Sequence, residues 1–397
     1  WLDPLIVQTG SGAINVNAGT VTTSANALSL TTQTGVITID GAISQSSGAL
    51  NLTTEGANIN INAAITQSTG AMTVNSGGAA ININAAVGGS TTGAWSFDTE
   101  GGALTVGGNV TKTGGSVAFN SGASQLIVNN ALSFGAANAT FTVSGAVADI
   151  TLNNTLAAST GSVQMTTGGG DITLAQAVTY SGAGALTLES NGGVISTAAI
   201  TQTTGSTSIT SGGAAITIGG TLNKTGGATT INSGAGQLTL NIVALGAGSL
   251  AMTTDSDVIL NGNLSGTGAF SLVQASDNVS LAIGTGEVGN ILIDDDEFAR
   301  IQNGWSSLTF GRSDSTASLN VKGGLTWNDS LVLQTGTGLL SLNGAQTMGG
   351  NNLTLRTDSA IVIGGTLSGS GAFALVQASA GVSMGLGDGQ AGTVHLD

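Results

Sequence analysis

The stretch GANININAAITQSTGAMTVNSGG, residues 56–78, decides the fold because its pattern returns about every 22 residues along most of the chain. It contains an alternating strand at 59–61, a second short strand that begins at Ile65, a turn at Gly70 and a third alternating strand at 72–74. Alternation places the apolar residues of each strand on one face. A unit this short cannot bury a core alone, so successive units must stack.

The repeat therefore predicts an all-β fold, a parallel β-helix solenoid of about 17 turns with about 22 residues per turn. Right-handed winding is expected because strands of L-residues twist in one sense. Such a solenoid forms a rod in which parallel ladders link each turn to the next.

Composition supports a strand-and-turn array over other classes. The 397 residues include 65 Gly, one Pro and no Cys, and only 7% are charged, against roughly 25% in an ordinary globular domain. Disorder is not expected, since 40% of the residues are hydrophobic and alternate regularly. No stretch approaches the roughly 18 apolar residues of a transmembrane helix, so none is predicted.

Charge and residue types exclude several functions. The formal net charge is -15, from 21 acids and 6 bases, which argues against nucleic-acid binding through phosphate neutralisation. The absence of Cys excludes disulfides and cysteine chemistry. The single histidine, His395, lies in a predicted strand, so neither a histidine-based triad nor a zinc site is expected.

Residues of the same type should stack in successive turns. Phe97 and Phe119 lie 22 positions apart, which predicts an internal aromatic stack. The position after the first strand of each turn carries short polar side chains, which predict a ladder of hydrogen bonds between turns. Its members are Asp40, Asn62, Asn84, Asn129, Asn153, Asn241 and Asn261.

The short second strand of the turn carries a repeated ITQ theme, beginning at Ile65 and again at Ile200. A flat and regular face of threonines would favour ice binding. Lys112 and Lys224 interrupt the theme, so we do not predict such a face.

Longer duplications are superimposed on the 22-residue repeat. Residues 110–127 recur at 222–239, and the run that begins DVILNGNLSGTGAF at Asp257 recurs from Ala360, 103 positions later. By the same offset, GQAGTVHLD at the end of the chain aligns with GEVGNILIDD. The chain thus stops where a second helix would begin, from which we expect the native polypeptide to continue.

One segment, DDDEFARIQNG, breaks the repeat. Asp294 or Asp295 can cap a helix, Glu297 suits its first turn, and Phe298 and Ile301 fall on one helical face. We predict a short helix over 295–302 that replaces part of a turn.

The strands around this helix follow from the same repeat. A first strand is expected at 279–281, and 291–293 is expected to share a sheet with 308–310. The expected organisation is one continuous solenoid, with turns over 1–293, a helical interruption over 294–304 and further turns over 305–397.

This segment is also the best candidate for a specific site. Polysaccharide-cleaving β-helices use clustered acids for Ca²⁺ and a nearby base. Possible metal ligands here are Asp294, Asp295, Asp296 and Asp314, with Arg300 and Arg312 close in sequence. We favour a structural interpretation, in which the acids cap the helix and pair with local arginines.

Two tryptophans accompany this segment. Trp305 and Trp327, 22 positions apart, are candidates for a glycan-stacking shelf. We favour the alternative that they cover the edges of the core where the helix interrupts it.

The repeat style, together with the run IDDDEFARIQNG followed by SLTFG at 307–311, resembles bacterial exoproteins of the filamentous-haemagglutinin type. These are secreted by two-partner or autotransporter routes and have β-helix passengers. The resemblance covers the repeat pattern, whereas neither a secretion cap nor a translocator barrel is visible, so the secretion route stays open.

The resemblance implies a secreted bacterial protein, extracellular or on the cell surface, that acts as an adhesin or as a fibre building block of a biofilm matrix. We expect no catalysis and no cofactor, although Ca²⁺ remains open. The expected partners are further copies, through the ends or sides of the rod, and surface or matrix glycans. The alternative is a polysaccharide-active enzyme with a site between Asp294 and Asp314.

Overall fold

The computed structural model describes residues 3–89, 92–386 and 392–396. The fold is all-β: a parallel β-solenoid of about 17 turns, each of about 22 residues, as the repeat predicts. The chain falls into two compact units, Trp1–Ser208 and Ile209–Asp397. The helical interruption at 294–304 therefore lies inside the second unit and does not separate the two.

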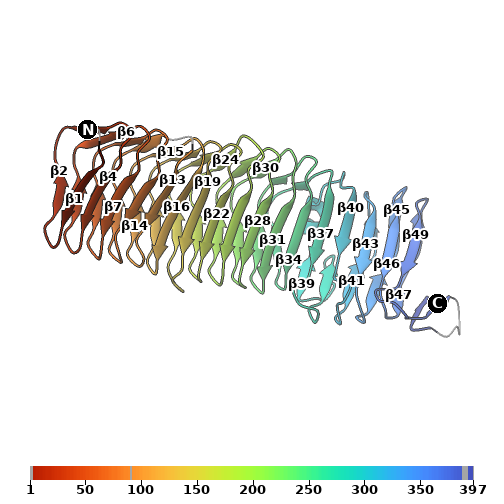
Figure 1. Ribbon diagram of the computed structural model, residues 1–397. Helices are drawn as coiled ribbons and strands as arrows, with labels where there is room; N and C mark the ends of the chain where they lie inside the picture. The colour runs from red at the N-terminus through yellow and green to blue at the C-terminus, as the bar shows by residue number, and fades with distance from the viewer. Residues whose placement is uncertain (1–2, 90–91, 387–391, 397) are drawn as a thin grey trace. The chain divides into compact units, whose positions relative to one another are not determined.

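Each turn of the first unit contributes one strand to each of three parallel sheets (Figure 1). The third alternating strand of the repeat forms one sheet: β1 (Leu5–Thr9), β4 (Leu28–Thr32), β7 (Leu50–Thr54), β10 (Met72–Asn75), β13 (Ala94–Asp98), β16 (Ser116–Gly122), β19 (Asn138–Val143), β22 (Val163–Thr167) and β25 (Leu186–Ser190). The boundary between the units falls in β28 (Thr207–Ser211).

The other two strands of the repeat form the other two sheets of this unit. One sheet contains β2 (Ile14–Val16), β5 (Ile37–Ile39), β8 (Ile59–Ile61), β11 (Ile81–Ile83), β14 (Leu104–Val106), β17 (Leu126–Val128), β20 (Ile150–Leu152), β23 (Ile172–Leu174) and β26 (Ile195–Thr197). The other contains β3 (Thr20–Thr23), β6 (Ala42–Gln45), β9 (Ile65–Gln67), β12 (Val87–Gly89), β15 (Val110–Lys112), β18 (Leu132–Phe134), β21 (Leu156–Ala158), β24 (Val178–Tyr180) and β27 (Ile200–Gln202).

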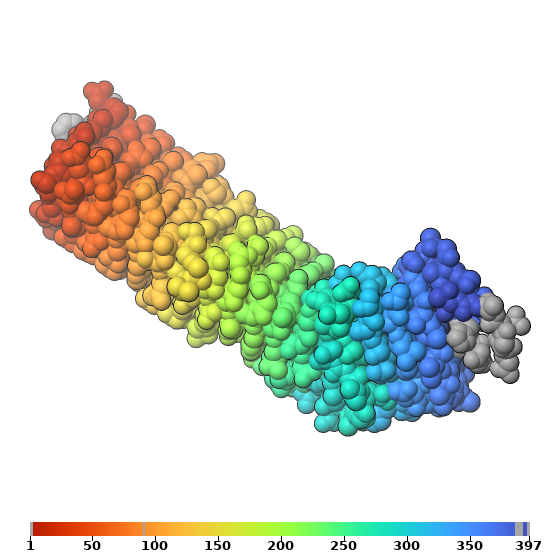
Figure 2. Space-filling view, turned by 90° about the horizontal axis from the view of Figure 1, so that it is seen from below, coloured from red at the N-terminus to blue at the C-terminus, as the bar shows by residue number. Residues whose placement is uncertain are grey.

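The core of the first unit lies between these sheets and follows the alternation of the sequence. In β8, Ile59 and Ile61 are fully buried, whereas Asn60 between them is partly exposed. Parallel register places like residues in contact, as between Ile59 and Ile81. The space-filling view shows successive turns of this unit packed in colour order from red to yellow (Figure 2).

Glycine is required at the corners chiefly because neighbouring turns approach closely. A Cβ atom on Gly70 would lie 2.0 Å from the carbonyl oxygen of Gly48 in the preceding turn. No other residue fits there without displacing the backbone. Positive φ is the reason at other corners, such as Gly77 with a φ of 58°.

The second unit begins with the same three-strand turns. One sheet contains β31 (Thr229–Gly234), β34 (Leu250–Thr254), β37 (Ala269–Val273), β40 (Ser307–Phe310), β43 (Leu331–Gln334), β46 (Leu353–Arg356) and β49 (Phe373–Val376). Before the helix, the other strands are β29 (Ile216–Ile218), β32 (Leu238–Leu240) and β35 (Val258–Leu260), and β30 (Leu222–Lys224), β33 (Val243–Ala244) and β36 (Leu264–Ser265).

Around and after the helix the sheets are regrouped. One contains β39 (Ile291–Ile293), β38 (Leu281–Ile283), β41 (Leu319–Lys322), β44 (Leu340–Asn343) and β47 (Ile361–Ile363), in that order. Another contains β42 (Leu325–Thr326), β45 (Gln346–Gly349) and β48 (Leu367–Gly369). Near the end of the chain, β50 (Met384–Leu386) pairs with β51 (Val394–Leu396), which is the strand predicted around His395.

The strands flanking the helix correct two predictions. The first strand starts at Leu281 and not at residue 279, and β39 pairs with it in the same sheet, Ile291 opposite Leu281. The expected pairing of 291–293 with the sheet of 308–310 is therefore wrong. The physical reason is a tight loop with positive φ at Gly284 and Gly286, which returns the chain to the strand it has just left.

The helix α1 (Asp295–Arg300) is the one helix in the described residues, and it ends two residues earlier than predicted. It ends because Ile301 is extended, with a ψ of 97°, and forms a parallel bridge with Leu264. Among the described residues no helix is long and apolar enough to cross a membrane.

Candidate functional site

The acidic run at the start of α1 is organised first by helix capping. The Asp294 side chain accepts a hydrogen bond of 2.8 Å from the backbone N–H of Glu297. The Glu297 carboxylate in turn accepts one of 3.2 Å from the backbone N–H of Asp294. This reciprocal pair is a capping box. Asp294 is thus committed to the helix, as the structural interpretation predicts.

Glu297 is also joined to the neighbouring turn. Its carboxylate accepts a hydrogen bond of 3.2 Å from the backbone N–H of Leu260 in β35. Burial raises the pKa of Glu297, against the opposing effect of its two backbone donors. The i to i+3 spacing of Asp294 and Glu297 is the sequence signal of this capping box, beyond the expected place of Glu297 in the first helical turn.

Asp295 forms an ion pair that was not predicted. Its carboxylate lies 2.5 Å from Nζ of Lys322 in β41 and accepts a hydrogen bond of 3.0 Å from the backbone N–H of Thr285. The hydrogen bond from Lys322 lowers the pKa of Asp295. The third acid, Asp296, is exposed in the first helical turn.

The arginines of the segment bind carbonyl groups of preceding turns. Arg300 donates to the carbonyl oxygen of Leu260, and Arg312 donates to that of Ala275. Arg312 also forms an ion pair with Asp314 at 2.5 Å and lowers the pKa of this carboxyl. Asp314 therefore pairs with a local arginine as expected, whereas Arg300 does not pair with the helix acids.

No three of the candidate metal ligands come together in one cluster. In the described part of the chain, no three His, Cys, Asp or Glu residues lie close enough to hold an ion. A hollow of about 150 Å³ is lined by Asp257, Asp294 and Glu297. Each of these carboxylates already accepts a backbone N–H, that of Asp257 from Leu292. We therefore interpret these three carboxylates as stabilising the helix.

Both candidate glycan-binding tryptophans are buried, which corrects the idea of a stacking shelf. Trp305 is 3% exposed and lies 5.5 Å from Phe270, ring centre to ring centre. Trp327 is 1% exposed and lies edge-on to Phe298 of the helix at 4.9 Å. Neither indole offers a face to a sugar. Both cover core that the interrupted turn would otherwise leave open.

The predicted stack of phenylalanine rings is present. The rings of Phe97 and Phe119 are parallel within 8° at 5.3 Å, and Phe141 extends the stack at 4.9 Å from Phe119. Phe141 lies 22 positions after Phe119. The same spacing is therefore the sequence signal for its place in the stack, although only Phe97 and Phe119 were predicted. Phe134, in a different sheet, adds a tilted contact.

The asparagine ladder is present in segments. Asn84 donates to Asn62 at 2.8 Å and Asn62 donates to Asp40 at 2.9 Å. Asn153 donates to Asn129 at 2.9 Å. Between these segments the turn carries Gly107, which has no side chain to continue the ladder. Further along, Asn241 donates to the carbonyl oxygen of Gly219, and Asn261 is held through its backbone N–H by Leu240.

A column of buried polar side chains was not predicted from the sequence. It occupies the end of the ITQ strands, where Gln67 donates to the carbonyl oxygens of Gly48 and Ala71 at 2.6 and 3.3 Å. Lys112 and Lys224 occupy the same position and point inward. Burial lowers the pKa of both lysines to about 8.

Lys112 shows how a lysine is accommodated there. Its Nζ donates to the carbonyl oxygen of Gly93 at 2.5 Å and lies 4.4 Å from the ring centre of Trp95. The aromatic face and the carbonyl group together partly replace water around the ammonium group.

Comparison with protein-family models, with curated proteins and with solved structures finds no match for this chain. The fold is that of a structural repeat protein, a β-solenoid.

Proposed function

We propose that this chain is a structural building block of a bacterial extracellular fibre or adhesin, and that it carries no catalytic activity. The observation that carries the proposal is the stacking of like residues in register, from the phenylalanines of the first unit to the asparagine ladder. Such columns stabilise a repetitive scaffold and leave its surface free for contacts.

The surface composition supports this proposal. A chain with 7% charged residues and a net charge of -15 presents mostly small polar groups. These can meet other copies or neutral glycans without desolvating many charges. The resemblance to filamentous-haemagglutinin-type exoproteins favours a secreted, cell-surface location.

The state of the acidic segment favours a scaffold over the rival enzyme. A glycan-cleaving site needs carboxylates poised to transfer protons or to hold a metal ion. Here Asp294 caps the helix, Asp295 pairs with Lys322, and Asp314 pairs with Arg312. These three carboxylates therefore take part in contacts that stabilise the fold.

Self-association and glycan capture test the proposal directly. Sedimentation of the purified chain over a range of concentrations, with electron microscopy of the same samples, should show assemblies that grow with concentration. A glycan array should report any adhesin ligand. A species that stays monomeric at high concentration and binds no glycan would contradict the proposal.

The enzymatic alternative is tested on the same preparation. Release of reducing or unsaturated ends should be absent across acidic and neutral polysaccharides. Activity that disappears in both Asp295→Ala and Arg300→Ala, while Asp296→Ala retains it, would replace the scaffold proposal by the enzyme.

A further inference from the structure

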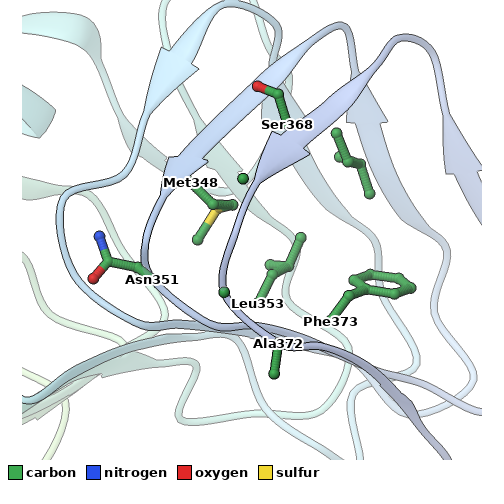
Figure 3. Close-up of a pocket in the computed structure, with 9 residues that line it drawn as sticks. Met348, Asn351, Leu353, Ser368, Ala372 and Phe373 are labelled. Carbon is green, nitrogen blue, oxygen red and sulfur yellow. The ribbon is translucent and has the colours of Figure 1, made fainter.

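The last strands of the second unit border an apolar hollow of about 280 Å³. Met348 in β45 and Leu367 in β48 line it from one sheet, and Leu353 in β46 and Phe373 in β49 line it from another. Figure 3 shows Met348, Leu353 and Phe373 around the hollow. Phe373 is 48% exposed. Within the described residues, β48 pairs only with β45 and β49 only with β46. The hollow is therefore a piece of core with one side uncovered.

The internal duplication shows how an equivalent surface is covered. At the 103-residue offset, Leu367 corresponds to Leu264 and Phe373 to Phe270. Both Leu264 and Phe270 are fully buried. The two copies thus present the same apolar residues, in one case beneath a cover and in the other without it.

The cover of the internal copy is the segment that follows α1. Ile301 forms a bridge with Leu264, and the next backbone N–H, of Gln302, donates to the Leu264 carbonyl oxygen at 2.9 Å. The ring of Trp305 then lies against Phe270. Leu308 in β40 pairs opposite Phe270 in the ladder.

A glycine makes room for the indole of the cover. A Cβ atom on Gly266 would lie 2.6 Å from the Trp305 ring, so the ring rests directly on the backbone there. The corresponding residue of the last turns is Gly369. There the atoms nearest to such a Cβ belong to Met348 and Gly349 of the preceding turn. At Gly369 this direction is therefore filled by the preceding turn, and the likeness of the two copies rests on their leucine and phenylalanine.

We propose that the open side of β48 and β49 is a docking surface for a polypeptide segment of the same kind as residues 294–310. Its ligand is a capped helical turn followed by an isoleucine, by a tryptophan four positions later and by an apolar strand. The isoleucine would bridge Leu367 and the indole would lie against Phe373. The biological use of this surface rests on the proposed building-block function, but the binding itself does not.

The first experiment measures binding of a labelled peptide with the sequence of residues 291–313 to the full chain by fluorescence anisotropy. Saturable binding is expected. Trp305→Ala or Ile301→Asp in the peptide should weaken it by at least about tenfold, as for a central aromatic anchor. In the protein, Phe373→Ser should have the same effect, whereas Val362→Ser, an equally exposed apolar residue outside the hollow, should have none.

A short peptide must become ordered when it binds, and this ordering lowers its affinity. The second experiment therefore joins the sequence of residues 295–330 covalently after Asp397, the position that corresponds to Asp294 at the same offset. Amide hydrogens of β48 and β49 should then exchange more slowly, and Trp305→Ala in the added copy should abolish this protection.

Absence of saturable peptide binding together with unchanged exchange in the extended chain would overturn the proposal, as would binding that is indifferent to Trp305→Ala. Peptide binding and self-association are separate measurements, because sedimentation of the unmodified chain reports association through any end or side of the solenoid. Failure of the docking proposal and failure of the scaffold proposal are thus separate results.

Discussion

A regular turn of the first unit and the interrupted turn of the second unit bury their apolar residues by different means. In the regular turn, Phe119 lies between two residues of its own kind, Phe97 and Phe141, at the same position of the repeat. In the interrupted turn, Phe298 of the helix meets Trp327, which lies in the following turn and in a different kind of element.

The difference lies in how widely stability is distributed. A regular turn repeats the contacts of its neighbours, so each contact is one of many and is replaceable by similar residues. The interrupted turn depends on single contacts, such as the cap at Asp294 and the ion pair of Asp295 with Lys322. We therefore expect substitutions there to act locally on α1, and substitutions in regular turns to act on the stacked strands.

The largest effect is expected from Trp327→Ala. It removes a buried ring and leaves Oε1 of Gln346 without the 2.9 Å bond from the indole N–H. The free energy of unfolding of the second unit should fall by about 4 to 5 kcal/mol, and the amides of α1 should lose protection in hydrogen exchange. Trp327→Phe is the matched control, with a smaller loss. Unchanged exchange in α1 would show that the helix is held by other contacts.

Phe119→Ala should follow closely in the regular turns. Loss of the central ring is expected to lower stability by about 3 to 4 kcal/mol. Protection should decrease in β13, β16 and β19 but not in α1. Phe119→Leu retains most of the buried volume and should cost about 1 kcal/mol. An equal loss of protection in α1 would contradict the separation of the two regions.

Alkaline pH should stabilise the regular turns that contain a buried lysine. The pKa of Lys112 is about 8 in the folded chain and 10.5 as its ordinary value, so the unfolded chain binds more protons between these values. The free energy of unfolding should therefore rise between about pH 8 and 10, by about 1 to 3 kcal/mol for each lysine. Thermal unfolding across this range measures the effect.

Lys112→Gln is the control, because glutamine occupies the same position at Gln67. This variant should lose the contribution of Lys112 to the pH dependence, while Lys224 retains its own. Above about pH 10 the ionisation of Tyr180 in the unfolded chain acts in the opposite direction, since burial raises its pKa when folded. Stability that falls between pH 8 and 10 would refute the assignment.

The smallest effect is expected from the helix cap. Asp294→Ala removes the acceptor for the N–H of Glu297 and should destabilise α1 by about 1 kcal/mol. Asp296→Ala, on an exposed residue of the same turn, should change stability by less than about 0.5 kcal/mol. Local exchange rates of residues 295–300 distinguish the two. Equal effects would mean that the charge of the first turn matters more than the capping geometry.

The fold was predictable because the 22-residue period places like residues in register. Strand alternation identified buried pairs such as Ile59 and Ile61, and the same spacing found the stack of Phe97 on Phe119. The 22-residue period did not predict that the Lys112 side chain points into the core. The aromatic face of Trp95 and the carbonyl group of Gly93, which accept its ammonium group, come from the preceding turn, so the local pattern of the short strand does not predict them.

The candidate site was only partly predictable. The cap at Asp294 follows from local residue order, and the pair of Arg312 with Asp314 joins neighbours in sequence. Lys322 and Leu260, which bind Asp295 and Arg300, lie in other turns whose register changes at the interruption. The register changes because β39 returns to pair with β38. The 22-residue period does not encode this pairing.

The central claim is that this chain supplies stacked turns that act as mechanical units. Unfolding the chain by force tests this claim. With the full chain held at its ends in an optical trap, we predict discrete steps of about 7 to 8 nm, the length of one 22-residue turn when extended. The interrupted turn should give a longer step, since Phe270 and Leu308 pair across 38 positions (308 − 270). Smooth extension at low force, without steps of this size, would contradict the claim.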